Sequence, residues 1–328
     1  MRQPYLLQVK DLCVNFTTNK NLFNTKNDVV HAVNHVSFNI KKGETLGIVG
    51  ESGCGKTTLG RALVRLIEPS LGKILFNGID ITQANSTEMK RLRQKMQIIF
   101  QNPYAALNPR KNIQFALSEP LQIHGLYQEK FQRKKRINEL LDYVQLSSDI
   151  LEKYPHEFSG GQRQRICIAR ALAANPEFII CDESVSALDV SIQAQILNLL
   201  KDLQKNLQLT YLFIAHDLNV VAYMADRVGV MYLGNIVELG NVEEVYYHSQ
   251  HPYTKALLSA IPKPDPKYKE EAIKLQGALP SLIQLPTGCH FHPRCWRATE
   301  KCKKDYPPIT NINHHTFRCY HPLQNEKK

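Results

Sequence analysis

The sequence has no long hydrophobic run. No stretch reaches the roughly 18 consecutive apolar residues that a membrane-spanning helix needs, and the mean hydropathy is −0.32. The first residues, Met1-Arg2-Gln3-Pro4-Tyr5, lack the apolar core of a signal peptide. We therefore expect a protein that stays in the cytosol and reaches a membrane only through a partner or a surface.

Acidic residues are fewer than basic ones, which gives a formal net charge of +11. Such an excess attracts nucleotides, nucleic acid or acidic headgroups, unless it only forms a solvated surface. The basic run Lys130–Arg136 lies in a stretch with helical spacing, so a charged outer face is the simpler interpretation there. With 328 residues, 43% of them hydrophobic, the chain is long enough for more than one domain.

Closely spaced cysteine pairs are also missing. Four cysteines are scattered through the first two-thirds, and the other four crowd near the C-terminus with the spacing C-x5-C-x6-C-x16-C: Cys289, Cys295, Cys302 and Cys319. Disulfides are rare in the cytosol, so such a group binds metal more often than it forms bridges. Four thiolates suit tetrahedral zinc or an iron–sulfur cluster. Zinc could also take histidine ligands, and four free thiols are the remaining alternative; the candidate histidines are His290, His292, His314 and His315.

One glycine-rich stretch carries the strongest chemical signal. Gly50-Glu51-Ser52-Gly53-Cys54-Gly55-Lys56-Thr57 fits the P-loop pattern G-x-x-x-x-G-K-[ST]. A short apolar strand at 45–49 precedes it, and helical spacing follows it as far as Ile67, before Pro69. Glycines let successive N–H groups turn toward a phosphate, and the helix end adds partial positive charge. Lys56 is expected to reach the β- and γ-phosphates, and Thr57 to bind magnesium.

Strand and helix patterns alternate along the chain, which predicts a largely parallel sheet. In such sheets ligands bind beyond the carboxyl ends of the strands. Five positions follow predicted strands directly and should gather at one edge: Gly50, Gln101, Asp182, Glu183 and His216. Asp182 offers a hard oxygen ligand for magnesium, and Glu183 can orient or deprotonate a water.

The other segments complete the predicted α/β fold. Strands at 6–16 and 29–39, and a hairpin turning at Asn77-Gly78, predict an antiparallel β subdomain. Residues 102–175 are predicted to form a helical insertion. Within it, Ser159-Gly160-Gly161-Gln162 begins a helix whose N–H groups suit a second anion. The proline-rich segment 251–328 predicts a small, irregular, cysteine-rich extension.

Together these residues resemble the ATP-binding subunit of ABC transporters over about residues 6–248. The resemblance implies a Walker A loop at Gly50–Thr57, followed by Thr58, and a Q-loop glutamine at Gln101. It implies a signature at Ser159-Gly160-Gly161-Gln162, a Walker B aspartate at Asp182 and a catalytic glutamate at Glu183. It also implies a D-loop at Ser186–Asp189 and a switch histidine at His216. It implies magnesium ligands Thr57, Gln101 and Asp182, with Phe16 stacking on adenine. The family's usual leucine and proline are Phe158 and Ser184 here, and we expect activity to survive both changes.

Two further stretches look like the oligopeptide/dipeptide importer group, namely Met96–Arg110 and His251-Pro252-Tyr253-Thr254. The long 17–28 loop and Gly53-Cys54-Gly55 resemble the group's second, F-type ATPase. This implies an ABC ATP-binding domain at 1–250 and the group's C-terminal extension at 251–328. Related ATPases carry this cysteine pattern, and some hold a 4Fe–4S cluster, so such a cluster in a structural role is the expectation, with zinc as the alternative.

The family implies a function for the whole chain. Its members pair head to tail, and ATP lies between one subunit's phosphate loop and the other's signature. The expectation is therefore an ATPase at the cytoplasmic face of the membrane that powers peptide import with a second ATPase and two permeases. An extracytoplasmic solute-binding protein would act indirectly, and no nucleic acid is expected.

Three alternatives remain for the function. The first is an importer ATPase for nickel or another small solute, the second is a soluble ABC ATPase that acts on nucleic acid, and the third is a regulator that does not hydrolyse ATP. The nucleic-acid class usually has a long coiled coil or two fused ATPase halves, and neither is found here.

Overall fold

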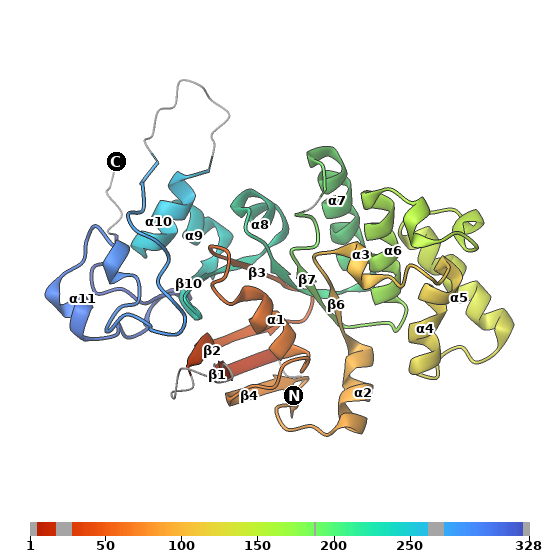
Figure 1. Cartoon of the computed structure of the whole chain (residues 1–328), viewed down its shortest axis with the longest axis horizontal. Coiled ribbons are helices and arrows are strands. Elements are labelled where there is room, and N and C mark those ends of the chain that lie inside the picture. The colour runs from red at the N-terminus through yellow and green to blue at the C-terminus, as the bar shows by residue number, and fades with distance from the viewer. Residues whose placement is uncertain (1–4, 18–27, 187, 262–271, 324–328) are drawn as a thin grey trace, which may run out of the picture.

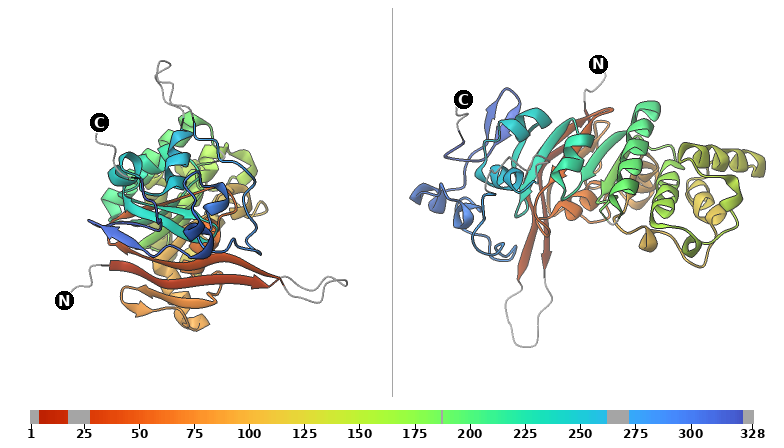
Figure 2. Two further views of the ribbon diagram at one scale, coloured as in Figure 1. Left: turned by 90° about the vertical axis from the view of Figure 1, so that its left-hand side faces the viewer. Right: turned by 90° about the horizontal axis from the view of Figure 1, so that it is seen from above.

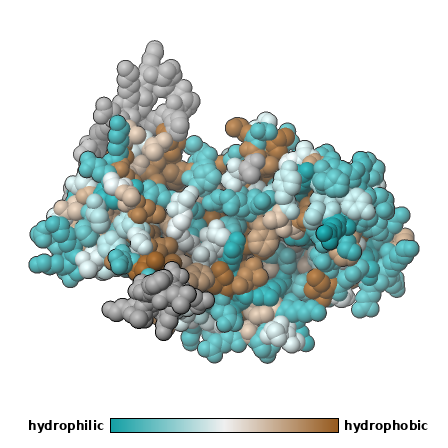
Figure 3. All heavy atoms as spheres, viewed as in Figure 1, coloured by the Kyte–Doolittle hydropathy of each residue, from teal (hydrophilic) through white to brown (hydrophobic). Residues whose placement is uncertain are grey.

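The computed structural model describes residues 5–17, 28–186, 188–261 and 272–323. Parts of the sequence predictions lie outside these ranges, including most of the 17–28 loop, Ala187 of the D-loop, and Pro262, Pro264 and Pro266. No helix of the described residues has the length and hydrophobicity to cross a membrane. The face seen in Figure 3 is mostly hydrophilic, with smaller hydrophobic areas between.

A mixed eight-stranded sheet forms the centre of the molecule (Figure 1). Its parallel part runs in the order β9-β3-β8-β7-β6, and β10, β12 and β11 continue it beyond β9 as antiparallel strands. The central strands are buried along their whole length, as expected for strands covered on both faces. The bounds are β3 (Thr45–Val49), β6 (Met96–Ile99), β7 (Phe178–Asp182), β8 (Thr210–Ile214), β9 (Arg227–Tyr232), β10 (Asn235–Asn241), β11 (Thr310–Ile312) and β12 (His315–Phe317).

A second, antiparallel sheet has the order β2-β1-β4-β5. Its strands are β1 (Tyr5–Thr17), β2 (Val29–Lys41), β4 (Leu71–Phe76) and β5 (Ile79–Asp80). The turn between β4 and β5 has positive φ at Asn77 (49°) and Gly78 (80°), which is why asparagine and glycine stand there. The predicted antiparallel β subdomain is therefore confirmed.

Helices cover both sheets and form a separate helical part at one end, opposite the cysteine-rich extension (Figures 1 and 2). They are α1 (Lys56–Leu63), α2 (Ser86–Lys95), α3 (Pro103–Ala106), α4 (Ile113–Ile123), α5 (Lys130–Tyr143), α6 (Gly160–Leu172), α7 (Val190–Leu207), α8 (Leu218–Met224), α9 (Val242–Tyr247), α10 (Pro252–Ser259) and α11 (Glu300–Lys304), with short 3-10 turns at Ser148–Ile150, Pro155–Glu157 and His292–Arg294. The helical insertion expected at 102–175 contains α3 to α6.

Two hydrophobic cores lie on the two faces of the main sheet. One joins the antiparallel sheet, α1 and the main sheet through residues such as Leu7, Ile48 and Leu59. The other joins the main sheet to the helical part, and it also includes Tyr253 and Phe291 of the C-terminal segment. The C-terminal segment therefore shares a core with the main sheet and the helical part.

Three details differ from the sequence expectations. Helix α1 ends at Leu63, and not near Ile67, because Arg65 takes a left-handed conformation (φ 54°) and Leu66 N–H bonds back to Arg61 O. The extension is irregular over most of its length, but its strands β11 and β12 join the main sheet through β10. In the basic run on α5, Arg136 is buried and donates to Leu172 O, so it belongs to the core of the helical part.

Candidate nucleotide-binding site

The glycine-rich loop joins β3 to α1 and leaves no room for side chains at two positions. A Cβ at Gly50 would lie 2.2 Å from Met231 O, and a Cβ at Gly55 would lie 2.0 Å from Ala32 O. Both glycines have positive φ, 153° and 104°. Gly55 also caps α1 without a side-chain hydrogen bond, so the N–H groups of the first turn stay available to an anion. The loop has the build of a phosphate cradle.

Lys56 is buried and bends back over this loop. Its Nζ donates to Gly50 O (2.7 Å) and Glu51 O (3.0 Å). The loop is thus closed around an ammonium group. A phosphate bound in it would exchange the carbonyl partners of Lys56 for a charged one, and such charge-assisted bonds are stronger.

Thr57 and Asp182 meet where α1 starts and β7 ends. The Thr57 hydroxyl donates to Asp182 Oδ1 (2.8 Å), and the Asp182 side chain is buried. Burial raises the pKa of this carboxyl above its usual value. The carboxylate and the hydroxyl offer two hard oxygen donors side by side, and such donors fit magnesium. These two predicted ligands are therefore together, next to the phosphate loop.

Three other predicted residues converge beside them. Gln101 Nε2 donates to Glu183 Oε2 (2.7 Å), and His216 Nδ1 lies 3.8 Å from the same oxygen. Glu183 has a left-handed backbone (φ 47°), which is uncommon outside glycine and turns the chain sharply at the end of β7. Its N–H donates to Ile214 O of β8. The convergence expected from the strand ends is present.

The signature residues lie at the start of α6, in the helical part and away from α1 (Figures 1 and 2). Ser159 Oγ accepts from Gln162 N–H (3.3 Å), and Gln162 Oε1 accepts from Ser159 N–H (3.1 Å), which is a capping box. Gly161 packs tightly on α7, because a Cβ there would lie 2.5 Å from Ile192 Cγ2. Asp189, the last residue of the expected D-loop, is the N-cap residue of the same α7.

A stacking contact holds the surface near Gln101, where the helical insertion begins. The ring of Tyr104 is exposed and lies 3.8 Å from the guanidinium carbon of Arg163, measured to the ring centroid. Phe16, the predicted adenine-stacking residue, lies in β1 opposite Val30 and is 40% exposed, so its ring is free for stacking.

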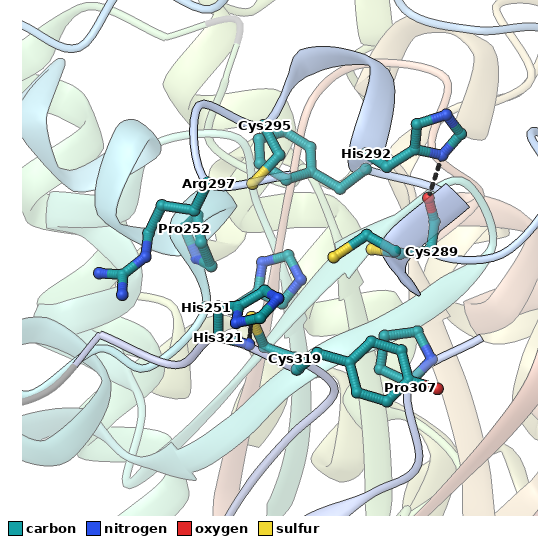
Figure 4. A pocket seen from close by; sticks show the side chains of 12 residues that line it. His251, Pro252, Cys289, His292, Cys295, Arg297, Pro307, Cys319 and His321 are labelled. Carbon is teal, nitrogen blue, oxygen red and sulfur yellow. Dashed lines mark hydrogen bonds between the residues drawn. The ribbon is translucent and has the colours of Figure 1, made fainter. Parts of the chain in front are cut away.

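The C-terminal cysteines line one cavity, together with His251, Phe291 and Tyr320; Figure 4 labels Cys289, Cys295 and Cys319 around it. Burial, followed by the neighbouring thiols, raises the pKa of Cys319 to about 12, and burial raises that of Cys289 to about 11. Within the described ranges, however, no group of three or more His, Cys, Asp or Glu residues is arranged to hold a metal ion. The sulfur atoms of the four cysteines are of the donor type that zinc or an iron–sulfur cluster takes. The predicted metal is nevertheless not confirmed and stays a prediction.

The histidines offered as alternative ligands have other partners. His315 Nε2 bonds to Glu238 Oε1 (2.7 Å), and His290 Nδ1 to Asn235 Nδ2 (3.1 Å). His292 does line the cysteine cavity, and its Nδ1 lies 3.0 Å from Cys289 O (Figure 4).

Two residues at the phosphate loop were missed by the sequence reasoning. Arg294 forms two hydrogen bonds with the Glu51 carboxylate, 2.7 and 3.0 Å long. Tyr253 Oη accepts from Glu51 N–H (2.9 Å). Both come from the C-terminal segment, more than 200 residues away in the chain, and no local pattern could reveal contacts of such separation.

The fold and the site together define a P-loop ATPase of the cassette type. The family model described as "ABC transporter" matches residues 33–186, and the model described as "Oligopeptide/dipeptide transporter, C-terminal region" matches residues 237–302. Among solved structures, a dimeric bacterial ABC transporter cassette, MJ0796, is 28% identical with a TM-score of 0.64, covering 72% of this chain and 98% of that one.

Curated relatives match almost the whole chain. The oligopeptide transport ATP-binding protein OppF of Haemophilus influenzae is 51% identical over 95% of both chains. The dipeptide transport ATP-binding protein DppF of the same organism is 49% identical, and AppF of Bacillus subtilis is 50% identical, each over 93% of both chains. The chain belongs to the ATP-binding subunits of the oligopeptide/dipeptide group of ABC transporters.

Proposed function

We propose that this chain hydrolyses ATP to power the import of oligopeptides or dipeptides across the cytoplasmic membrane. The observation that carries the proposal is the meeting of the phosphate loop with Asp182, Glu183, Gln101 and His216 at one sheet edge. The relatives OppF, DppF and AppF are oligopeptide or dipeptide transport ATP-binding proteins, and they supply the solute class.

In the hydrolytic step, Glu183 acts as general base. Its carboxylate takes a proton from the water that attacks the γ-phosphorus, while the bond to the ADP oxygen breaks. Gln101 donates to Oε2 of this carboxylate and orients it. His216 lies near the same oxygen. It would form a hydrogen bond with the γ-phosphate, and this bond would be lost when the phosphate leaves. Lys56 and the N–H groups of the loop hold the phosphates, and Phe16 stacks on adenine.

Magnesium, held by Thr57, Asp182 and Gln101, neutralises phosphate charge when it is bound. The buried Asp182 carboxylate and its hydroxyl neighbour Thr57 support this assignment. Thr58, next in α1, belongs to the same loop-to-helix junction.

The partner ATPase supplies the second half of each site. Ser159, Gly160, Gly161 and Gln162 begin a helix in a different part of the molecule from α1. The N–H groups of Gly160 and Gly161 take no part in the capping box, so they suit a phosphate bound by another subunit. Asp189 is the N-cap residue of α7, the helix on which Gly161 packs, and the similar cassette MJ0796 has a dimeric structure. The complex would include two permeases, contacted near Tyr104, and act at the cytoplasmic face with a solute-binding protein.

Uptake into vesicles tests this function. The chain, a partner ATPase and two permeases are reconstituted with a solute-binding protein, and ATP-dependent uptake of a labelled peptide mixture is compared with that of nickel. Peptide uptake that unlabelled peptide abolishes is expected, because the extension matches the peptide group. Nickel uptake without peptide uptake would overturn the solute, and absence of ATP hydrolysis would overturn the function.

The four clustered cysteines are proposed to hold a 4Fe–4S cluster that keeps the irregular extension in shape. Their position around one cavity and their soft donors support this. Anaerobically purified protein is then brown and contains about four irons per chain. Colourless protein with one zinc would establish the alternative, and protein with neither metal would leave four free thiols.

A further inference from the structure

Glu51 lies in the phosphate loop, where its carboxylate brings a negative charge to the place at which a triphosphate would bind. Every polar group of this residue is engaged. Its N–H donates to Tyr253 Oη, its carbonyl accepts from Lys56 Nζ, and its carboxylate accepts two bonds from Arg294. Two of these three partners belong to the C-terminal segment.

Arg294 is set up to hold Glu51 in one orientation. Its side chain is only 8% exposed, and both of its terminal nitrogens meet the two carboxylate oxygens of Glu51, the fork geometry that favours arginine. The hydrogen bonds that the guanidinium donates to Glu51 raise its pKa further above its already high value. The pair is therefore a fixed, charged contact between the extension and the loop.

The support behind this contact is rigid. Tyr253 is fully buried, and its ring centroid lies 4.6 Å from that of Tyr232 and 5.4 Å from that of Phe291. Phe291 is also fully buried and precedes Arg294 by three residues, with its carbonyl accepting from Arg294 N–H. The same packed group of aromatic side chains thus fixes the positions of Tyr253 and Arg294, the two partners of Glu51 from the C-terminal segment.

We propose that Arg294 is a positioning residue of the nucleotide site: it neutralises Glu51 and fixes the phosphate loop, so that the extension is part of the ATP-binding apparatus. The inference rests on the proposed role of Gly50–Thr57 as the phosphate loop. Without Arg294, the Glu51 carboxylate stands uncompensated beside the phosphates and repels them. The extension thereby sets the affinity for nucleotide, while Glu183 sets the rate of hydrolysis.

Binding of a fluorescent ATP analogue to the full-length chain tests this. Arg294→Gln is expected to weaken binding by about tenfold, the loss typical of a hydrogen bond to a charged group. The KM for ATP rises similarly, and kcat at saturating ATP is retained. Arg294→Lys, which keeps the charge without the fork, falls between the two. Arg297→Gln is the matched control, since it removes the same charge from the same segment beside the cysteine cavity.

The double variant Glu51→Gln/Arg294→Gln separates a charge effect from a folding defect. It is expected to bind nucleotide more tightly than Arg294→Gln alone, because the uncompensated carboxylate is gone. Binding by Arg294→Gln equal to that of the unaltered chain overturns the inference, and so does a double variant without recovery. If the unaltered chain itself binds no nucleotide, or Lys56→Ala binds as well as it does, the proposed phosphate loop fails instead.

Discussion

At the scale of single residues, the proposed function divides the site into groups that would hold phosphate and groups that would act on water. Lys56 and the loop N–H groups belong to the first kind, and Glu183 with its neighbours Gln101 and His216 belongs to the second. Within the part of the chain that the structure describes, Glu183 forms no hydrogen bond with the phosphate loop. The two tasks can therefore be separated by single substitutions.

Glu183→Gln is expected to lower ATP hydrolysis by at least about a hundredfold, because the amide cannot accept the proton of the attacking water. Nucleotide binding persists, since Lys56 and the loop are untouched. Phosphate release and binding of a fluorescent ATP analogue are measured on the same preparation. The control is Glu243→Gln, an exposed carboxylate in the first turn of α9. Full turnover in Glu183→Gln would instead favour a nucleotide-binding regulator that uses no general base.

At the scale of elements, the start of α6 is fixed by packing against α7. Gly160 and Gly161 are neighbours with different surroundings. A Cβ at Gly160 would lie 3.5 Å from Leu188 Cδ2, an ordinary contact, whereas at Gly161 it would lie 2.5 Å from Ile192 Cγ2. The second glycine is needed for the close approach of the two helices.

Gly161→Ala is expected to lower the free energy of unfolding by about 1–3 kcal/mol, the usual cost of overpacking. Gly160→Ala is the matched control and should unfold at the same or a slightly higher denaturant concentration, because alanine favours a helix over glycine. Urea unfolding followed by circular dichroism measures both. Equal midpoints for the two variants would show that α6 and α7 can separate without cost.

At the scale of the whole molecule, the extension is also docked through a buried carboxylate, in addition to the Arg294–Glu51 contact and its aromatic residues. Glu238 of β10 is fully buried, and its carboxylate accepts from His315 Nε2 of β12 (2.7 Å), Gln250 N–H (2.6 Å) and His251 N–H (3.0 Å). One carboxylate thus ties β12 and the start of α10 to the main sheet.

His315→Ala should cost about 3 kcal/mol of stability, because it leaves the buried Glu238 carboxylate short of a partner. His314→Ala, at the exposed neighbouring position, is the control and should change stability by less than about 0.5 kcal/mol. Chemical unfolding measures the difference, and limited proteolysis of residues 272–323 reports whether the extension has come loose. If both variants behave alike, the hydrogen bond between His315 and Glu238 contributes little to docking.

The sequence alone determined the order of strands and helices, the phosphate loop and the residues that follow the strands. These are local properties, since glycine spacing, strand length and helical periodicity are set within a few residues. It overestimated the length of α1, because the chain ends that helix with Arg65 in a left-handed conformation, which glycine usually adopts. It gave no indication that β11 and β12 extend the sheet, because strands of three residues show no periodicity.

Only the tertiary structure decided how the C-terminal segment meets the ATP site. Arg294 and Glu51 are 243 positions apart, and their contact depends on the packing of Phe291 with Tyr253 and Tyr232. His315, a candidate metal ligand from its position near the cysteines, instead pairs with Glu238 once β12 joins β10. Such pairings depend on the folding of distant strands against one another, and spacing along the chain carries no information about them.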